Sequence, residues 1–235
     1  MNRREMIAAA GATFGSALLT ACDSTGPARA AGALTFAQHK NETLERALFS
    51  HRSRDRVAPG VGVAGDKFPS YFISDRVPIW DAAMRGAWRL EVGGMVSRPM
   101  AFSLDDLMRL ERQTQRVNHY CVEGWTAVAD FTGVPVSALA AACGVDPASR
   151  FVDFESFDDG YHESWDIESA MHPQTIIVYG KDGSPLSAAY GAPARVHSPV
   201  KYGYKNTKYL TRVMFLPAAN GGYWSDRGYE WYGGL

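Results

Sequence analysis

The sequence has few cysteines, and their spacing pairs none of them in a metal-binding motif. Its 235 residues include only Cys22, Cys121 and Cys143. A zinc-finger type site is therefore excluded, because it needs Cys-x-x-Cys or similar spacing. The absence of Cys-x-x-Cys-His likewise excludes a covalently attached haem. No apolar run reaches the roughly 18 residues that a transmembrane helix requires.

Charge of one sign is not in excess either. The chain carries 24 basic and 25 acidic residues, for a net charge of −1. This balance gives no overall attraction to nucleic acid. With 46% apolar and 21% charged residues, the composition is that of a globular protein with one large core or two small ones, and it excludes a disordered or collagen-like chain.

The first 22 residues are predicted to be an export signal. Arg3 and Arg4 precede a short apolar run from Met6 to Ala21, a pattern that indicates the twin-arginine route for proteins exported already folded. Leu19-Thr20-Ala21-Cys22 is similar to a lipobox, in which the cysteine is acylated and anchors the protein to a membrane. The alternative is ordinary cleavage near Ala28 to Ala31. Both readings place the mature protein in the periplasm.

The rest of the chain is predicted to be a tether over residues 23–67, with a short helix around Glu42 to Phe49, followed by one compact domain over residues 68–235. Apolar and polar residues alternate as in half-buried strands in several segments of that domain. A helix cap at Ser103 and a stop at Gly144 delimit two helices. The predicted strands cover residues 88–92, 117–121, 150–155, 176–179 and 209–216, and the helices 104–110 and 137–143. Many strands with few helices predict a mixed α+β fold.

Cys121 is the most informative residue, because it is a lone thiol in the stretch HYCVEGW. A thiolate is a soft ligand that suits a transition metal, but a single cysteine needs further ligands from elsewhere. An organic cofactor is the best source of them. The later stretch GAPARVHSPVKYGYKNTKYL supplies Arg195, Lys201, Lys205 and Lys208 among glycines and prolines, as a pocket for a phosphorylated cofactor would need.

Taken together, HYCVEGW, FESF, AMHPQTIIVYGKDGSPL, the basic stretch and the closing GGYWSDRGYEWYGG resemble the molybdopterin-binding domain of the sulfite oxidase superfamily. The likeness is greatest to its bacterial periplasmic branch, which includes protein-methionine-sulfoxide reductase catalytic subunits. The resemblance covers residues 68–235. It implies molybdenum held by one molybdopterin and one protein cysteine, in a strand-rich α+β domain without an immunoglobulin-like dimerisation domain, and hence a monomer.

The resemblance also implies roles for individual residues. Cys121 matches the catalytic cysteine that ligates molybdenum. The positions that match cofactor contacts are Ser156, Tyr190, Arg195 and the loop Gly203-Tyr204-Lys205. In sulfite oxidases an Arg-Asn-His segment contributes as well, and Ser74, Asp75 and Arg76 occupy its place here as second-rank candidates for cofactor binding.

The implied chemistry is oxygen-atom transfer to or from a small sulfur or nitrogen centre, for example a sulfoxide-type substrate. Because the chain has no haem motif of its own, we expect electrons to be exchanged with a separate haem protein or cytochrome. The sequence leaves the substrate and the direction of electron flow open.

Three alternatives stay open at this stage. Cys121 and Cys143 could form a disulfide in an oxidising compartment. Cys121 could act as the nucleophile of a secreted hydrolase with His119 or His197 as base, although these histidines could equally carry protons near a cofactor or be structural. The chain could also be a non-enzymatic lipoprotein that keeps the fold as a binding module.

Overall fold

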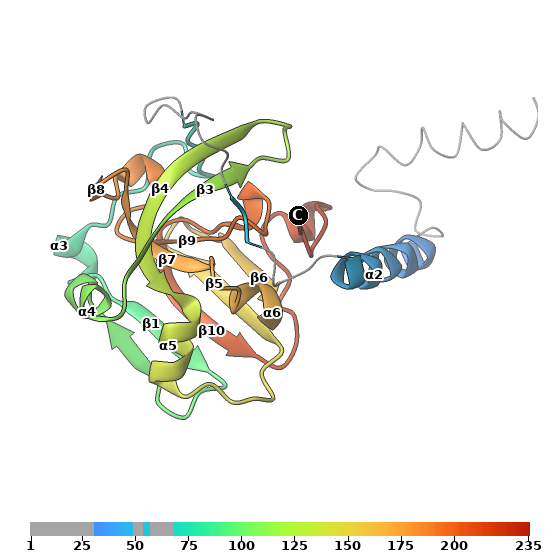
Figure 1. Cartoon of the computed structure of the whole chain (residues 1–235), viewed down its shortest axis with the longest axis horizontal. Helices are drawn as coiled ribbons and strands as arrows, with labels where there is room; N and C mark the ends of the chain where they lie inside the picture. Colours follow the sequence, from blue (N-terminus) through green and yellow to red (C-terminus); the bar gives the residue numbers. More distant parts are fainter. Residues whose placement is uncertain (1–30, 49–53, 57–67) are drawn as a thin grey trace, which may run out of the picture. The chain divides into compact units, whose positions relative to one another are not determined.

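The computed structural model describes residues 31–48, 54–56 and 68–235 of the chain (Figure 1). The chain divides into two compact units, Met1–Leu48 and Phe49–Leu235. The described part of the first unit is one helix, α2 (Ala31–Leu48), which starts earlier than the predicted helix around Glu42. The predicted export signal, with Cys22, lies outside the described residues. Among the helices that are described, none is both long and apolar enough to cross a membrane.

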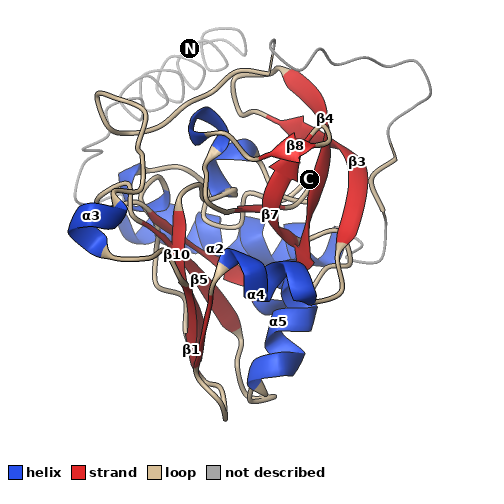
Figure 2. Cartoon of the chain, turned by 90° about the vertical axis from the view of Figure 1, so that its left-hand side faces the viewer, coloured by secondary structure: helices blue, strands red, loops and turns tan. Residues whose placement is uncertain are grey.

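The second unit is built on two five-stranded sheets, which Figure 2 shows as separate sets of strands. The first has the order β2 (Met100–Phe102), β1 (Leu90–Gly94), β10 (Leu210–Leu216), β5 (Phe151–Ser156) and β6 (His162–Asp166). The second has the order β3 (Gln113–Tyr120), β4 (Thr126–Pro135), β7 (Ile176–Lys181) and β8 (Ser184–Pro185), and β9 (Arg195–His197) also pairs with β7. All pairings are antiparallel except that of β1 with β10. The predicted strand-rich α+β fold is confirmed.

Two helices contact strands of both sheets: α4 (Leu104–Arg109) touches β2 and β4, and α5 (Val136–Cys143) touches β1 and β4. The largest apolar cluster includes the fully buried Leu139 of α5 and Phe154 of β5. The shorter elements are α3 (Ala82–Arg85), α6 (Ile167–Ala170) and the 3-10 turns η3 (Ala188–Tyr190), η4 (Gly203–Lys205) and η5 (Ser225–Arg227).

The predicted ends of both longer helices are confirmed. The Ser103 hydroxyl accepts a hydrogen bond from the Asp106 amide at 3.1 Å, and the Asp106 carboxylate accepts one from the Ser103 amide at 3.0 Å. These reciprocal bonds satisfy two amides that the helix leaves without partners. Gly144 ends α5 in the left-handed region, with φ of 66°, which only glycine adopts readily.

The predicted strand before Cys121 is also found, and it is longer than the sequence indicated. Strand β3 starts at Gln113 and pairs with β4 in continuous register as far as Tyr120 opposite Thr126. Its side chains alternate, with Val117 and His119 buried and Arg116 exposed. Because both strands stop there, Cys121 falls in the turn that joins them. This register therefore places the cysteine at one end of the second sheet.

Loss of the α4 cap should weaken the unit measurably. We expect Ser103→Ala to lower the free energy of unfolding by about 1 kcal/mol, because the Asp106 amide loses its acceptor. Urea unfolding followed by circular dichroism measures this change. Ser137→Ala, at an exposed position of α5, is the matched control and should leave the unfolding midpoint in place. An equal loss in both variants would contradict the role of the cap.

Candidate active site

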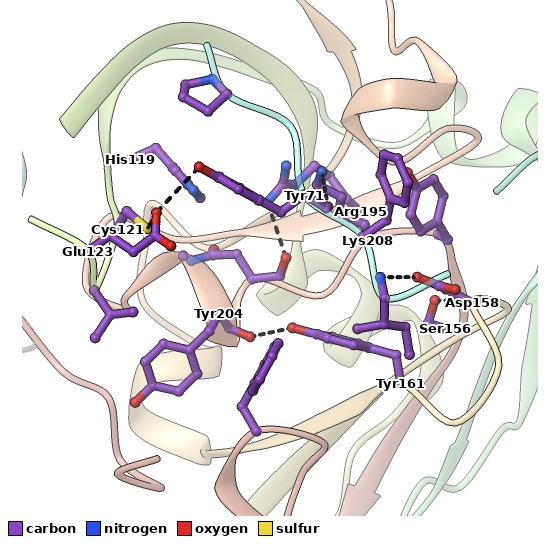
Figure 3. A pocket seen from close by; sticks show the side chains of 18 of the residues that line it. Tyr71, His119, Cys121, Glu123, Ser156, Asp158, Tyr161, Arg195, Tyr204 and Lys208 are labelled. Atoms are coloured by element: carbon purple, nitrogen blue, oxygen red, sulfur yellow. Dashed lines mark hydrogen bonds between the residues drawn. The ribbon is translucent and has the colours of Figure 1, made fainter. Parts of the chain in front are cut away.

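Cys121 is held by a tight turn between β3 and β4. Its amide donates to the carbonyl of Trp125 at 2.9 Å, and the Gly124 amide donates back to the Cys121 carbonyl at 3.0 Å. Gly124 adopts a φ of 86°, which a residue with a side chain rarely adopts. The turn leaves the Cys121 side chain half-buried at the wall of a cavity (Figure 3).

This cavity has a volume of about 370 Å³. Its walls come from segments far apart in the sequence: the Cys121 turn, residues 68–73, the region after β5, residues 203–209 and aromatic residues near the C-terminus. Aromatic residues are the largest group in its lining, and polar and charged side chains share the same walls. Such a pocket is the expected form of a binding site for an organic molecule.

The structure brings half of the predicted site residues together. Cys121, Ser156, Arg195, Gly203 and Tyr204 all line the cavity. Ser156 is the last residue of β5, and its hydroxyl accepts from the Asp158 amide at 2.8 Å. Cys121 and Arg195 come from opposite edges of the second sheet, since β3 and β9 are separated by β4 and β7.

The second-rank candidates lie elsewhere. Ser74, Asp75 and Arg76 are exposed and do not line the cavity, and the Ser74 hydroxyl donates to Asp158. Tyr190 is outside the lining as well. Its hydroxyl donates to the Phe68 carbonyl at 2.9 Å, and its own carbonyl accepts from Arg195 at 3.3 Å. Tyr190 therefore holds the Arg195 guanidinium through its carbonyl and does not line the cavity.

Lys205 is also not in the cavity, and this differs from its predicted role at a phosphate. Its ammonium donates to the Glu163 carboxylate at 2.6 Å, and both side chains are fully buried. Lys201 is bound in the same way to Asp166 at 2.8 Å. A buried lysine that already faces a carboxylate has its charge compensated. Both lysines therefore act as internal ion pairs.

Lys208 is the lysine of the basic stretch that lies at the cavity, although the sequence singled out Lys205 for the phosphate. It lines the cavity, and its ammonium donates to the carbonyls of Tyr71 at 2.7 Å and Ala189 at 3.1 Å. Burial, with a contribution from the nearby Arg195, lowers the pKa of Lys208 to about 7. Among the described residues no carboxylate lies within ion-pair distance of it.

Arg195 resembles Lys208 in having no carboxylate partner among the described residues. It is buried, and its guanidinium donates only to backbone carbonyls, those of Tyr190, Val196 and Asn206. Burial lowers its pKa to about 10. Arg195 is buried and Lys208 is half-buried, and neither has a carboxylate partner in the described structure. Together they could form an anion site, because an anion would supply the missing charge.

Several buried polar atoms without hydrogen-bond partners lie in the cavity lining or directly behind it. Within the described residues, Nδ1 of His119 and both ring nitrogens of His197 lack a hydrogen-bond partner, as does the hydroxyl of Tyr209. His119 lines the cavity, and a Cβ on Gly203 would lie 2.7 Å from its Nε2. Gly203 thus leaves room for the imidazole. Unsatisfied buried groups are rare and often belong to a site for a polar ligand.

The geometry argues against two of the alternative readings. Cys121 and Cys143 are both free thiols, so they form no disulfide. For a hydrolase, a histidine would have to activate the thiol. Burial instead lowers the pKa of His119 well below its usual value and raises the pKa of Cys121. The Cys121 thiol donates instead to a Glu123 carboxylate oxygen at 3.9 Å.

Some cavity residues could not be selected from the sequence. Asp158, Tyr161 and Tyr71 carried no motif signal, and Lys208 was only one of several lysines in a basic stretch. Pairing with Glu163 or Asp166, from the distant strand β6, decides which lysines are free to face a ligand. These ion pairs join residues that are far apart in the sequence, so no local sequence pattern could reveal them.

The donor set fits the molybdopterin cofactor that the resemblance implies. No group of three or more His, Cys, Asp or Glu side chains in the described residues could hold a metal alone. One thiol therefore needs ligands from an organic group. Cys121 could hold the metal, and Arg195 and Lys208 could hold an anionic phosphate. The aromatic walls could hold a heterocyclic ring.

Comparisons with known proteins agree with this fit. The profile of the oxidoreductase molybdopterin binding domain family matches residues 75–224. A protein of Azospira oryzae named "Putative protein-methionine-sulfoxide reductase subunit YedZ1" is 37% identical over 221 residues, which cover 94% of this chain and 83% of that protein. The protein-methionine-sulfoxide reductase catalytic subunit MsrP of Ralstonia nicotianae is 32% identical over 144 residues, 55% of this chain and 44% of its own length.

A solved structure adds a likeness of fold. The sulfane dehydrogenase SoxCD from Paracoccus pantotrophus superimposes with a TM-score of 0.54 at 25% identity, over 57% of this chain and 39% of that chain. The matches to MsrP and SoxCD thus span less than half of those proteins. The match of the family profile covers more than half of this chain. The chain therefore belongs to the oxidoreductase molybdopterin-binding domain family of the sulfite oxidase superfamily and is a molybdopterin-dependent oxidoreductase.

Proposed function

We propose that this chain is the catalytic subunit of an exported reductase that removes the oxygen atom from a sulfoxide, with a methionine sulfoxide side chain as the substrate class. The observation that carries the proposal is a cavity lined by the Cys121 thiol together with the buried Arg195 and the half-buried Lys208, neither of which has a carboxylate partner among the described residues. The names of the most similar relatives support the choice of a sulfoxide. The reaction takes two electrons and two protons, breaks the sulfur–oxygen bond and releases a thioether and water.

Within this proposal the residues of the cavity divide by task. Cys121 ligates molybdenum, and Arg195 and Lys208 bind the phosphate of the pterin through charge-assisted hydrogen bonds. Ser156, Gly203 and Tyr204 border the same space. When bound, the molybdenum centre supplies two-electron oxygen-atom transfer, so the protein contributes ligation, orientation and exclusion of water.

The aromatic side chains of the cavity suit a neutral sulfur compound. Tyr71 stacks on Trp125 with ring centroids 6.1 Å apart, and Trp224 lies 5.0 Å from Tyr229. All four residues line the cavity. Sulfur makes favourable contacts with aromatic rings, and rings of this kind offer little to a charged substrate such as sulfite. These four aromatic side chains therefore favour a thioether or sulfoxide at their end of the cavity, whereas the anion is assigned to Arg195 and Lys208.

Electrons would come from a separate redox protein, a membrane haem protein or a soluble cytochrome, because the sequence has no haem-attachment motif. We propose that the protein works as a monomer in the periplasm, exported folded by the twin-arginine route. It is held to the membrane, in this proposal, by a lipid on Cys22.

The role of Cys121 is tested by its replacement. We expect Cys121→Ser to abolish sulfoxide reduction and to remove the sulfur-to-metal absorption bands, because the soft ligand is lost. Cys143→Ala, at a buried position of α5, is the matched control and should keep both. Turnover with reduced viologen dye and absorption spectroscopy measure the two effects. Normal activity in Cys121→Ser would refute the proposal.

Lys208 and Lys205 should respond in opposite ways to the same substitution. Lys208→Met should weaken cofactor binding roughly 10- to 100-fold while leaving the apoprotein folded, because an uncompensated cation is removed. Lys205→Met should instead cost about 3–5 kcal/mol of stability, because Glu163 is left buried without its partner. Pterin content per protein and thermal unfolding separate the two outcomes. Full pterin content in Lys208→Met would exclude Lys208 from the phosphate site.

Export can be tested independently of catalysis. Changing Arg3 and Arg4 together to Lys should leave the protein in the cytoplasm, because the twin-arginine pair is read by the transport machinery. Cys22→Ala should still allow export but release the protein from the membrane fraction. Mass spectrometry of the mature amino terminus checks the lipid. An unmodified terminus downstream of Cys22 would defeat the lipid anchor and leave folded export standing.

A further inference from the structure

Glu123 lies two residues after Cys121 in the same turn, and its carboxylate contacts three side chains there. One of its carboxylate oxygens accepts from the Trp125 indole at 3.1 Å and from the Tyr71 hydroxyl at 3.3 Å. The same oxygen lies 3.9 Å from the Cys121 sulfur. Figure 3 shows Glu123 beside Cys121 with the Tyr71 ring reaching towards it. One oxygen atom thus touches both aromatic side chains at this end of the cavity and the sulfur.

The charge of this carboxylate is not neutralised locally. No lysine, arginine or histidine of the described residues forms an ion pair with Glu123. Its partners are two neutral donors, which share its charge without cancelling it. The cations of the cavity, Arg195 and Lys208, bind groups elsewhere in its wall. The sulfur therefore has a negative charge as its polar neighbour.

We propose that Glu123 is a positioning residue that also lowers the reduction potential of the metal centre, and this rests on the proposed ligation of molybdenum by Cys121. Reduction adds negative charge to the centre. A carboxylate beside the ligand sulfur opposes that addition, so it stabilises the oxidised form. The hydrogen bonds to Trp125 and Tyr71 fix the carboxylate at this distance and fix the two rings against each other.

The two tasks can be separated by variants. Glu123→Gln removes the charge but keeps an oxygen that accepts from Trp125 and Tyr71, so the midpoint potential should rise while KM for the sulfoxide stays close to that of the wild type. Tyr71→Phe removes one donor and leaves the charge, so the potential should fall or stay while KM rises. Asp130→Asn removes one negative charge on β4, where Asp130 faces Arg116 at 3.5 Å outside the cavity. This control should leave the potential unchanged.

The measurement is a redox titration of the purified holoprotein, followed by the electron paramagnetic resonance signal of pentavalent molybdenum. Because Glu123 is exposed, the difference between wild type and Glu123→Gln should shrink as salt rises from about 0.01 M to about 1 M, where the screening length falls from about 30 Å to about 3 Å. A structural effect on the turn would not depend on salt in this way.

Each outcome decides between the claims. A higher potential in Glu123→Gln alone, reduced by salt, supports the inference. An unchanged potential in that variant, an equal rise in Asp130→Asn, or a rise in Tyr71→Phe would overturn it while leaving the proposed function intact. Wild-type protein that holds molybdenum without a spectroscopic dependence on Cys121 would overturn both.

Discussion

The register of the β3–β4 hairpin is the constraint on which the site depends. Pairing runs from Gln113 opposite Gly133 to Tyr120 opposite Thr126, and it leaves Cys121 in a turn closed by its own backbone bonds to Trp125 and Gly124. Side chains along a strand alternate between faces, so a slip of one residue would turn His119 and Val117 outwards and move the thiol away from the cavity. The core enforces this register, because Val117 packs with Phe131 and Val178 in the second apolar cluster.

Buried ion pairs determine which basic side chains of residues 191–210 can face the cavity. Lys201 and Lys205 are bound to Asp166 and Glu163 of β6, and Glu163 also accepts from the Trp224 amide at 2.9 Å. These buried pairs therefore help fasten the C-terminal aromatic segment to the first sheet, where it forms one wall of the cavity. Removing one partner of such a buried pair is costly. In the proposed function the ligand is therefore bound by Arg195 and Lys208, which have no carboxylate partner among the described residues.

The sequence predicted what depends on local rules and short spacing. The cap at Ser103 and the stop at Gly144 were both readable, because each satisfies a backbone requirement within a few residues. Motifs singled out Cys121 and Arg195, and both line the cavity. The sequence could not show that Lys208 lines the cavity and Lys205 does not, because Lys205 is paired with Glu163, 42 residues away in the chain. Predicted tether residues behave likewise: Asp55 accepts from the Asn118 amide at 2.9 Å, a contact that no local pattern signals.

The spread of the cavity residues along the chain links cofactor binding to folding. The cavity collects residues from Phe68 to Tyr229, so it exists only after both sheets and the C-terminal segment have assembled. Arg195 is buried and Lys208 is half-buried, and neither has a carboxylate partner among the described residues, so an anion bound beside them would stabilise that wall. A ligand that binds only the folded state stabilises it in proportion to the logarithm of its concentration over its dissociation constant. A phosphorylated cofactor therefore both completes the charge balance and favours the assembled fold. Under the proposed folded export, cofactor loading and folding would both precede transport, which is the order that a twin-arginine signal would permit.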